Sequence, residues 1–136
     1  MHYLNILTKT AADTSLLRKV LADLGRQSKQ DIYLSLCSKS QIQALNKKYR
    51  RINKPTDVLS FSSGDIIITP AIAKVNAKKY HNSLNAELIY LLIHGFCHLH
   101  GHDHAGQKDT KRMRQAENKF LTYIRKKYNI IITGRI

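Results

Sequence analysis

The chain has 136 residues, enough for one domain (residues 1–136) with a modest hydrophobic core. Its 23 lysines and arginines against 9 aspartates and glutamates give a formal net charge of +14, which favours a polyanionic partner such as nucleic acid, although a basic surface can also serve solubility alone. With two cysteines, no signal-peptide pattern and no apolar segment of transmembrane length, the sequence excludes a disulfide framework, and we expect a soluble cytoplasmic protein with no membrane partner.

The N-terminal third of the sequence predicts a strand, a helix and a second strand. Residues 3–7 have the pattern of a short strand. The helix that follows is capped by Asp13 or Thr14 and ends at Gly25. Apolar residues then alternate with polar ones over 32–37, which indicates a half-buried strand.

A second helix is predicted after this strand. Ser38 and Gln41 have the spacing of a capping box, in which each residue satisfies a backbone N–H of the other. The expected apolar stripe of this helix consists of Ile42, Leu45 and Tyr49. Its basic end, residues 47–51, complements the helix dipole and stays in solvent.

The middle of the chain predicts two more strands and a short helix. Residues 58–61 and 66–68 are the strands, joined by a turn. Thr69 and Pro70 then form an N-cap and first-turn proline, opening a helix with Ile72 and Val75 inward. Because strands and helices do not strictly alternate, we expect an α+β fold in which helices pack on a mixed sheet of about four strands.

The C-terminal part of the chain predicts two helices separated by a loop. Ser83 caps the first of them, which carries leucines at helical spacing. The apolar stripe of the second consists of Met113, Ala116, Phe120 and Ile124. Its opposite face carries Lys111, Arg112, Arg114, Lys119, Arg125, Lys126 and Lys127. Since the chain has no tryptophan, we expect a basic groove that holds nucleic-acid bases loosely, without strong stacking.

Residues 94–104 carry the most specific pattern, with five of the seven histidines. A zincin-like helix places His94 and His98 one turn apart, about 6 Å along the axis and about 40° around it, so both can reach one metal ion. Gly101 can end this helix and turn the chain so that His104 becomes a third ligand. Three histidines without a fourth protein ligand are typical of a catalytic zinc site that keeps one open position.

One residue separates this pattern from that of the metallopeptidases. Where those enzymes have a glutamate as general base after the first histidine, this chain has Gly95. Without it, no adjacent group takes the proton of the attacking water. The sequence therefore favours phosphodiester chemistry, in which a metal supplies Lewis acidity and a cation neutralises developing charge. A zincin-type metallopeptidase is the alternative enzyme class.

Two motifs together resemble a known family. One is H-G-x-x-H-x-x-G-x-D-H at residues 94–104, and the other is Y-R-x-x-x-K-P-T-D-V-L-S-F at residues 49–61. Their order and spacing resemble the YbeY family of bacterial endoribonucleases and rRNA maturation factors over roughly residues 30–125. The chain departs from the usual pattern at Ser62, where a proline is common, and at His100 and His102, where leucine and tyrosine are typical.

The resemblance implies one Zn²⁺ per chain, held by His94, His98 and His104, and a catalytic role for Arg50. It implies a single-strand-specific, metal-dependent endoribonuclease that processes the 3′ end of small-subunit ribosomal RNA and acts in ribosome quality control. The implied partners are single-stranded RNA, the small subunit and its assembly factors. Asp103 is expected to accept a hydrogen bond from a ligand imidazole. The non-enzymatic alternative is an assembly factor with a structural zinc.

Several residues within or beside the two motifs could have either a structural or a functional role. His100 and His102 are expected to lie outside the ligand triad, although each remains an alternative ligand. Cys97 is expected to be a small buried residue rather than a soft metal ligand. Asp57 is expected to cap a turn or orient Arg50 rather than to act as a general base.

Overall fold

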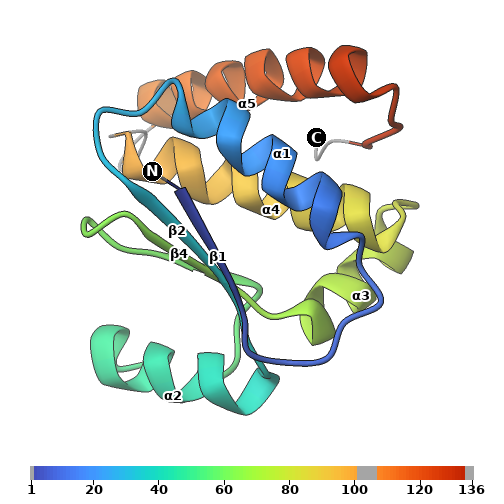
Figure 1. Ribbon diagram of the computed structural model, residues 1–136. Coiled ribbons are helices and arrows are strands. Elements are labelled where there is room, and N and C mark those ends of the chain that lie inside the picture. Colours follow the sequence, from blue (N-terminus) through green and yellow to red (C-terminus); the bar gives the residue numbers. More distant parts are fainter. Residues whose placement is uncertain (1, 101–106, 134–136) are drawn as a thin grey trace.

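The computed structural model describes residues 2–100 and 107–133, and its centre is a four-stranded mixed sheet (Figure 1). The strands are β1 (His2–Ile6), β2 (Ile32–Leu36), β3 (Val58–Ser60) and β4 (Asp65–Ile68). In the order β1-β2-β4-β3, the first three run parallel and β3 pairs antiparallel to β4. The predicted α+β fold with about four strands is confirmed.

Helices cover both faces of this sheet. They are α1 (Thr14–Gly25), α2 (Lys39–Arg50), α3 (Pro70–Lys79), α4 (Leu84–Leu99) and α5 (Gln107–Tyr128). Helices α1 and α4 lie on one face with α5 outside them, and α2 lies on the other face (Figure 1). In the described ranges, no helix is both long enough and apolar enough to cross a lipid bilayer.

Side-chain caps fix where three of the helices begin. Asp13, Ser38 and Ser83 each accept a hydrogen bond from a backbone N–H of the first turn, in α1, α2 and α4 respectively. At α2 the capping box is complete: Gln41 N donates to Ser38 Oγ over 3.2 Å, and Ser38 N donates to Gln41 Oε1 over 2.8 Å. The sequence predicted these caps because they depend on local spacing.

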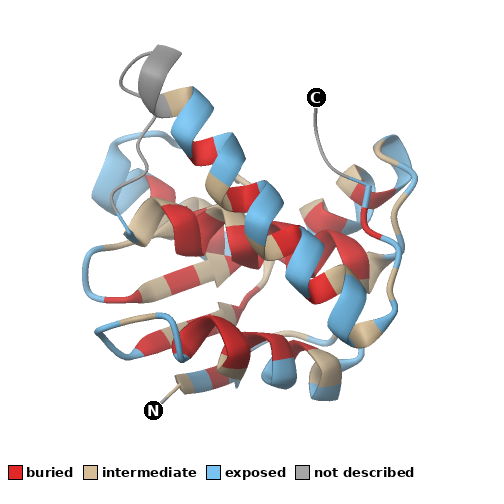
Figure 2. Ribbon diagram, turned by 90° about the horizontal axis from the view of Figure 1, so that it is seen from above, coloured by how far each residue is buried: buried red, intermediate tan, exposed pale blue. Residues whose placement is uncertain are grey.

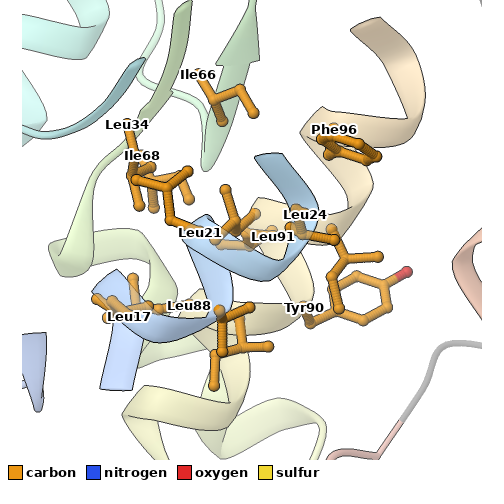
Figure 3. Packing of buried hydrophobic residues seen from close by; sticks show 14 of the residues in the cluster. Leu17, Leu21, Leu24, Leu34, Ile66, Ile68, Leu88, Tyr90, Leu91 and Phe96 are labelled. Carbon is orange, nitrogen blue, oxygen red and sulfur yellow. The ribbon is translucent and has the colours of Figure 1, made fainter. Parts of the chain in front are cut away.

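The main hydrophobic core lies between the sheet and helices α1 and α4, with α4 at its centre (Figures 2 and 3). Helix α4 is buried almost without interruption because the sheet, α1, α3 and α5 surround it. Its partners in this core include Leu17, Leu21, Leu24, Leu34, Ile66 and Ile68 (Figure 3). Packing on so many sides holds the helix that carries His94 and His98 rigidly against the sheet.

Two residues predicted to face inward are exposed. Val75 is 65% exposed, and α3 instead turns Ala73 and Ala77 inward. The small alanines let α3 pack closely against α4. Tyr49, predicted on the apolar stripe of α2, is 57% exposed, because the small cluster under this helix is built around Ile42 and does not reach its last turn.

Candidate active site

A cleft of about 810 Å³ opens between α4 and the segment that leads from α2 into β3. His94 and His98 line it from the C-terminal half of α4. Arg50, the last residue of α2, and Ser60 in β3 also line it. The fold therefore brings residues from both sequence motifs, far apart along the chain, into one cavity.

The two histidines on α4 face each other. Their Nε2 atoms lie 3.1 Å apart, and their ring centroids 4.7 Å apart. Two imidazole nitrogens bound to one zinc ion at about 2.0–2.1 Å in tetrahedral geometry would lie about 3.3 Å apart. The spacing of His94 and His98 therefore fits a shared metal ion.

A buried carboxylate behind the pair orients His94. Glu117, on α5 and only 7% exposed, places Oε1 2.5 Å from His94 Nδ1. Its other oxygen accepts a hydrogen bond of 3.5 Å from the Tyr90 hydroxyl. A carboxylate at Nδ1 favours the tautomer with the proton on that nitrogen, which leaves the Nε2 lone pair available to a metal ion.

The sequence interpretation missed Glu117. It assigned Ala116 and Phe120 to the apolar stripe of α5, but these two are only half-buried. The buried positions of the stripe are Met113, Glu117, Leu121 and Ile124. The sequence did contain one signal for Glu117, because it lies one helical turn after Met113 and therefore on the buried face of α5. A carboxylate on a buried face requires a partner.

Replacing Glu117 with glutamine should weaken metal binding. The amide keeps the size of the side chain but loses the charge that holds the His94 ring, so we expect the metal dissociation constant to rise by about 10- to 100-fold. Competition with a chromogenic chelator measures this constant. Asp31→Asn, which also removes one negative charge but lies just before β2 and outside the cleft lining, should bind metal as the parent does. Equal affinity in Glu117→Gln and the parent would contradict the role of Glu117.

Arg50 is held at the cleft by two contacts. Its Nη2 donates a hydrogen bond of 3.0 Å to the Ser60 carbonyl, and its Cζ lies 5.8 Å from the centroid of the Phe61 ring. The hydrogen bond occupies one N–H group of the guanidinium, and the cation lies over the Phe61 ring. Its remaining N–H groups stay available for a bidentate contact with an anion in the cleft.

The family comparison covers the part of the chain that forms this cleft. The family model described as "Endoribonuclease YbeY" matches residues 5–125. The chain belongs to the YbeY family. That match spans Arg50, His94, His98 and Glu117, so every side chain placed so far in the candidate site lies within the YbeY region.

Individual YbeY relatives match most of the chain. Endoribonuclease YbeY of Carboxydothermus hydrogenoformans is 36% identical over 128 residues, covering 88% of this chain and 84% of the relative. Endoribonuclease YbeY of Halalkalibacterium halodurans is 31% identical over 140 residues, covering 85% and 88%. The solution structure of TM1509 from Thermotoga maritima matches with a TM-score of 0.64 and 28% identity, covering 93% of this chain and 91% of that one.

Asp57, within the second YbeY motif, has a structural role. Its Oδ1 accepts a hydrogen bond of 2.8 Å from Val58 N, and its Oδ2 accepts one of 3.1 Å from Asn76 Nδ2. The carboxylate thus caps the turn into β3 and ties it to α3. Of the two structural roles expected from the sequence, the structure supports turn capping, whereas the guanidinium of Arg50 bonds to Ser60.

Two neighbouring residues, Cys97 within α4 and His100 at its C-cap, have surroundings of their own. The Nδ1 atom of His100 lies 2.9 Å from the carbonyl oxygen of Phe96, and its ring packs against the Phe96 ring. Cys97 is buried, and burial together with the Glu117 carboxylate raises the pKa of its thiol to about 12. The thiol therefore stays protonated at neutral pH, as expected for a core residue.

The third expected ligand of the YbeY triad, His104, lies outside the described residues, as do Gly101, His102 and Asp103. Over residues 2–100 and 107–133, no group of three His, Cys, Asp or Glu side chains is arranged to hold a metal ion. The described part of the site therefore contributes a pair of candidate ligands, and the metal-binding role of His94, His98 and His104 stays a prediction.

Gly95 lets α4 approach the sheet between the two histidines. A Cβ atom at this position would lie 2.9 Å from Ile66 Cγ2 and 3.4 Å from Val58 Cγ2. Both are branch atoms of β-branched side chains, which are held close to the backbone of the sheet and cannot swing away. The position after the first histidine is therefore packed against the sheet, with no room for the glutamate of a metallopeptidase.

Gly95→Ala should destabilise the fold by about 1–3 kcal/mol through overpacking against β4. A loss of stability would be informative, because in an unobstructed helix the same glycine-to-alanine change stabilises by about 1 kcal/mol. Urea unfolding measures the free energy, and Ile66→Ala provides the control. Since it removes the clashing methyl, the double variant should lose less than the sum of the two single losses. A gain in stability for Gly95→Ala alone would contradict the close contact.

Proposed function

We propose that this protein is a zinc-dependent endoribonuclease that cleaves single-stranded RNA. The proposal rests on one observation: in this YbeY-family chain, Arg50 lines the same cleft as His94 and His98, whose spacing fits a shared metal ion. Its proposed place of action is the cytoplasm, in maturation of the 3′ end of small-subunit ribosomal RNA and in ribosome quality control. The proposed partners are the small subunit and its assembly factors.

The metal ion would be held by His94 and His98 of the described site together with His104. A bound zinc ion supplies Lewis acidity towards a phosphate oxygen and lowers the pKa of a bound water. Glu117 fixes the ring of His94 so that Nε2 is presented to the cleft. This arrangement aligns the ligand before metal and substrate arrive.

Arg50 would act on the scissile phosphate. The hydrogen bond to Ser60 and the contact with Phe61 hold its guanidinium at the cleft before substrate arrives. A preorganised donor of this kind stabilises the extra negative charge that develops on the phosphoryl oxygens, and it does so without reorganisation during the reaction. Arg50 is therefore assigned to the transition state rather than to general attraction.

The exposed cations around the cleft would hold the flanking phosphates. Residues 47–51 include four lysines and arginines, and Lys54 follows on the loop that lines the cavity. These side chains are exposed, so they can neutralise a backbone that passes over the cleft. These five side chains are part of the 23 lysines and arginines that give the chain its net charge of +14.

Two observations argue against the rival functions. The packing of Gly95 against Ile66 leaves no place for the general base of a metallopeptidase. The histidine pair opens into a cleft of about 810 Å³, whereas structural zinc sites are closed by four protein ligands. Both observations favour an enzyme that admits a large substrate to the metal.

The proposal is tested with three substrates in parallel: a labelled single-stranded RNA, the same strand annealed to its complement, and casein. We expect cleavage of the single strand, much slower cleavage of the duplex, and intact casein. His94→Ala, purified in the same way, serves as the control for contaminating nucleases and should be inactive. Casein digestion would support the peptidase, and equal RNA cleavage by His94→Ala would remove the evidence for an enzyme.

A further inference from the structure

An exposed aromatic side chain packs against a residue of the cleft wall. Tyr49, in the last turn of α2, is 57% exposed, and its ring packs edge-on against Phe61 with the centroids 5.3 Å apart. Phe61 lines the cleft and is fixed by the turn between β3 and β4: its N–H donates to the Asp65 carbonyl and its carbonyl accepts from Gly64 N, each over 2.9 Å. The Tyr49 ring is therefore supported from the cleft wall while much of its surface remains in solvent.

Positive charge surrounds this aromatic pair. Lys48 Nζ lies 5.1 Å from the centroid of Tyr49, and Arg50 Cζ lies 5.8 Å from that of Phe61. Lys47, Arg51 and Lys54 are exposed on the same segment of chain. An exposed ring among cations matches a nucleic-acid single strand, because the cations neutralise phosphates while the ring stacks on a base.

We propose that Tyr49, supported by Phe61, stacks an unpaired RNA base beside the phosphate that Arg50 contacts. The inference rests on the proposed function, because it takes RNA as the substrate. In a duplex, both faces of each internal base are covered by its neighbours, so only a single strand can offer a base to this ring. The stack thus contributes to the preference for single strands, and it tolerates any base because every base has a π-face.

A second aromatic pair lies outside the cleft, at another edge of the sheet. Tyr3 and Tyr33 stack on adjacent strands with centroids 5.1 Å apart, at the β1 edge of the sheet, away from β3. Burial, followed by the charges of Asp31 and Asp65 among other groups, raises the pKa of the Tyr33 hydroxyl. These two rings are not part of the cleft lining. Tyr3, which is 41% exposed, is therefore a matched control for Tyr49.

The chain has no tryptophan, so a single substitution provides a specific fluorescent probe. Tyr49→Trp and Tyr3→Trp are each titrated with a short oligoadenylate in the presence of EDTA, which prevents cleavage. We expect the single strand to quench Tyr49→Trp strongly and its duplex to quench it little. Tyr3→Trp should not respond. An unchanged Tyr49→Trp signal while RNA binds, or equal quenching of both probes, would overturn the inference.

Binding and kinetics give a second, independent readout. Tyr49→Ala should weaken single-strand affinity on the order of tenfold, whereas Tyr49→Phe, which keeps the ring, should bind as the parent does. The loss should fall on the half-saturating RNA concentration more than on the rate at saturation. If the parent cleaves RNA and Tyr49→Ala binds single-stranded RNA as tightly as the parent does, the stacking inference alone is overturned. If the parent neither binds nor cleaves RNA, the proposed function is overturned as well.

Discussion

His98→Ala should lose most of the bound metal and with it the cleavage of RNA, whereas His100→Ala, two residues further along the chain, should keep both. The reason is geometric. His98 Nε2 faces His94 Nε2 across 3.1 Å in the cleft, whereas the ring of His100 packs on Phe96. With one ligand removed, the remaining imidazoles hold zinc far less tightly, since each contributes one of the few protein bonds to the ion.

Metal content of the two variants is measured by mass spectrometry after dialysis, and cleavage is followed on one labelled single strand. Circular dichroism confirms that both variants are folded. Equal loss of metal from His98→Ala and His100→Ala would mean that the ligands are wrongly assigned.

Arg50→Lys should slow single-turnover cleavage by roughly 10²-fold or more, the effect of removing one preorganised group that stabilises developing charge. Lysine keeps the positive charge, so RNA affinity should change little. It loses the planar fork, and its ammonium cannot make the hydrogen bond to Ser60, the cation–π contact with Phe61 and a bidentate phosphate contact together. The change therefore separates transition-state stabilisation from simple attraction.

Three quantities are measured on one preparation of Arg50→Lys: metal content, single-strand affinity and single-turnover rate. Metal content should equal that of the parent, because no candidate ligand is altered. Arg51→Lys is the matched control, since Arg51 follows directly in the chain as the left-handed C-cap of α2. Cleavage by Arg50→Lys at the parental rate would reduce Arg50 to one of several surface cations.

Features that depend on neighbours in the sequence were predictable. The caps at Asp13, Ser38 and Ser83 follow from a polar side chain placed just before an apolar helical pattern. The facing of His94 and His98 follows from the pitch of one helix. The placement of Arg50 in the same cleft was expected only because both motifs resemble one family, and the structure supplies the contact with Ser60 that holds it there.

Features that depend on packing between distant elements were not predictable. Glu117 meets His94 only because α5 crosses α4, and no local pattern encodes that crossing. Tyr49 continues the apolar stripe of α2 in sequence, yet the helix runs past the small cluster beneath it and leaves the ring exposed. Val75 is exposed for a similar reason, because the close approach of α3 to α4 selects alanines rather than larger side chains.

RNA cleavage by this protein should require a metal ion held by the histidine pair. This requirement is measured as single-turnover cleavage of one labelled single strand by one preparation in three states: as purified, after chelation, and after return of zinc. We expect loss of cleavage on chelation, recovery with zinc, and no recovery in His98→Ala treated identically. Cleavage that survives removal of the metal, or that zinc restores equally in His98→Ala, would contradict this requirement.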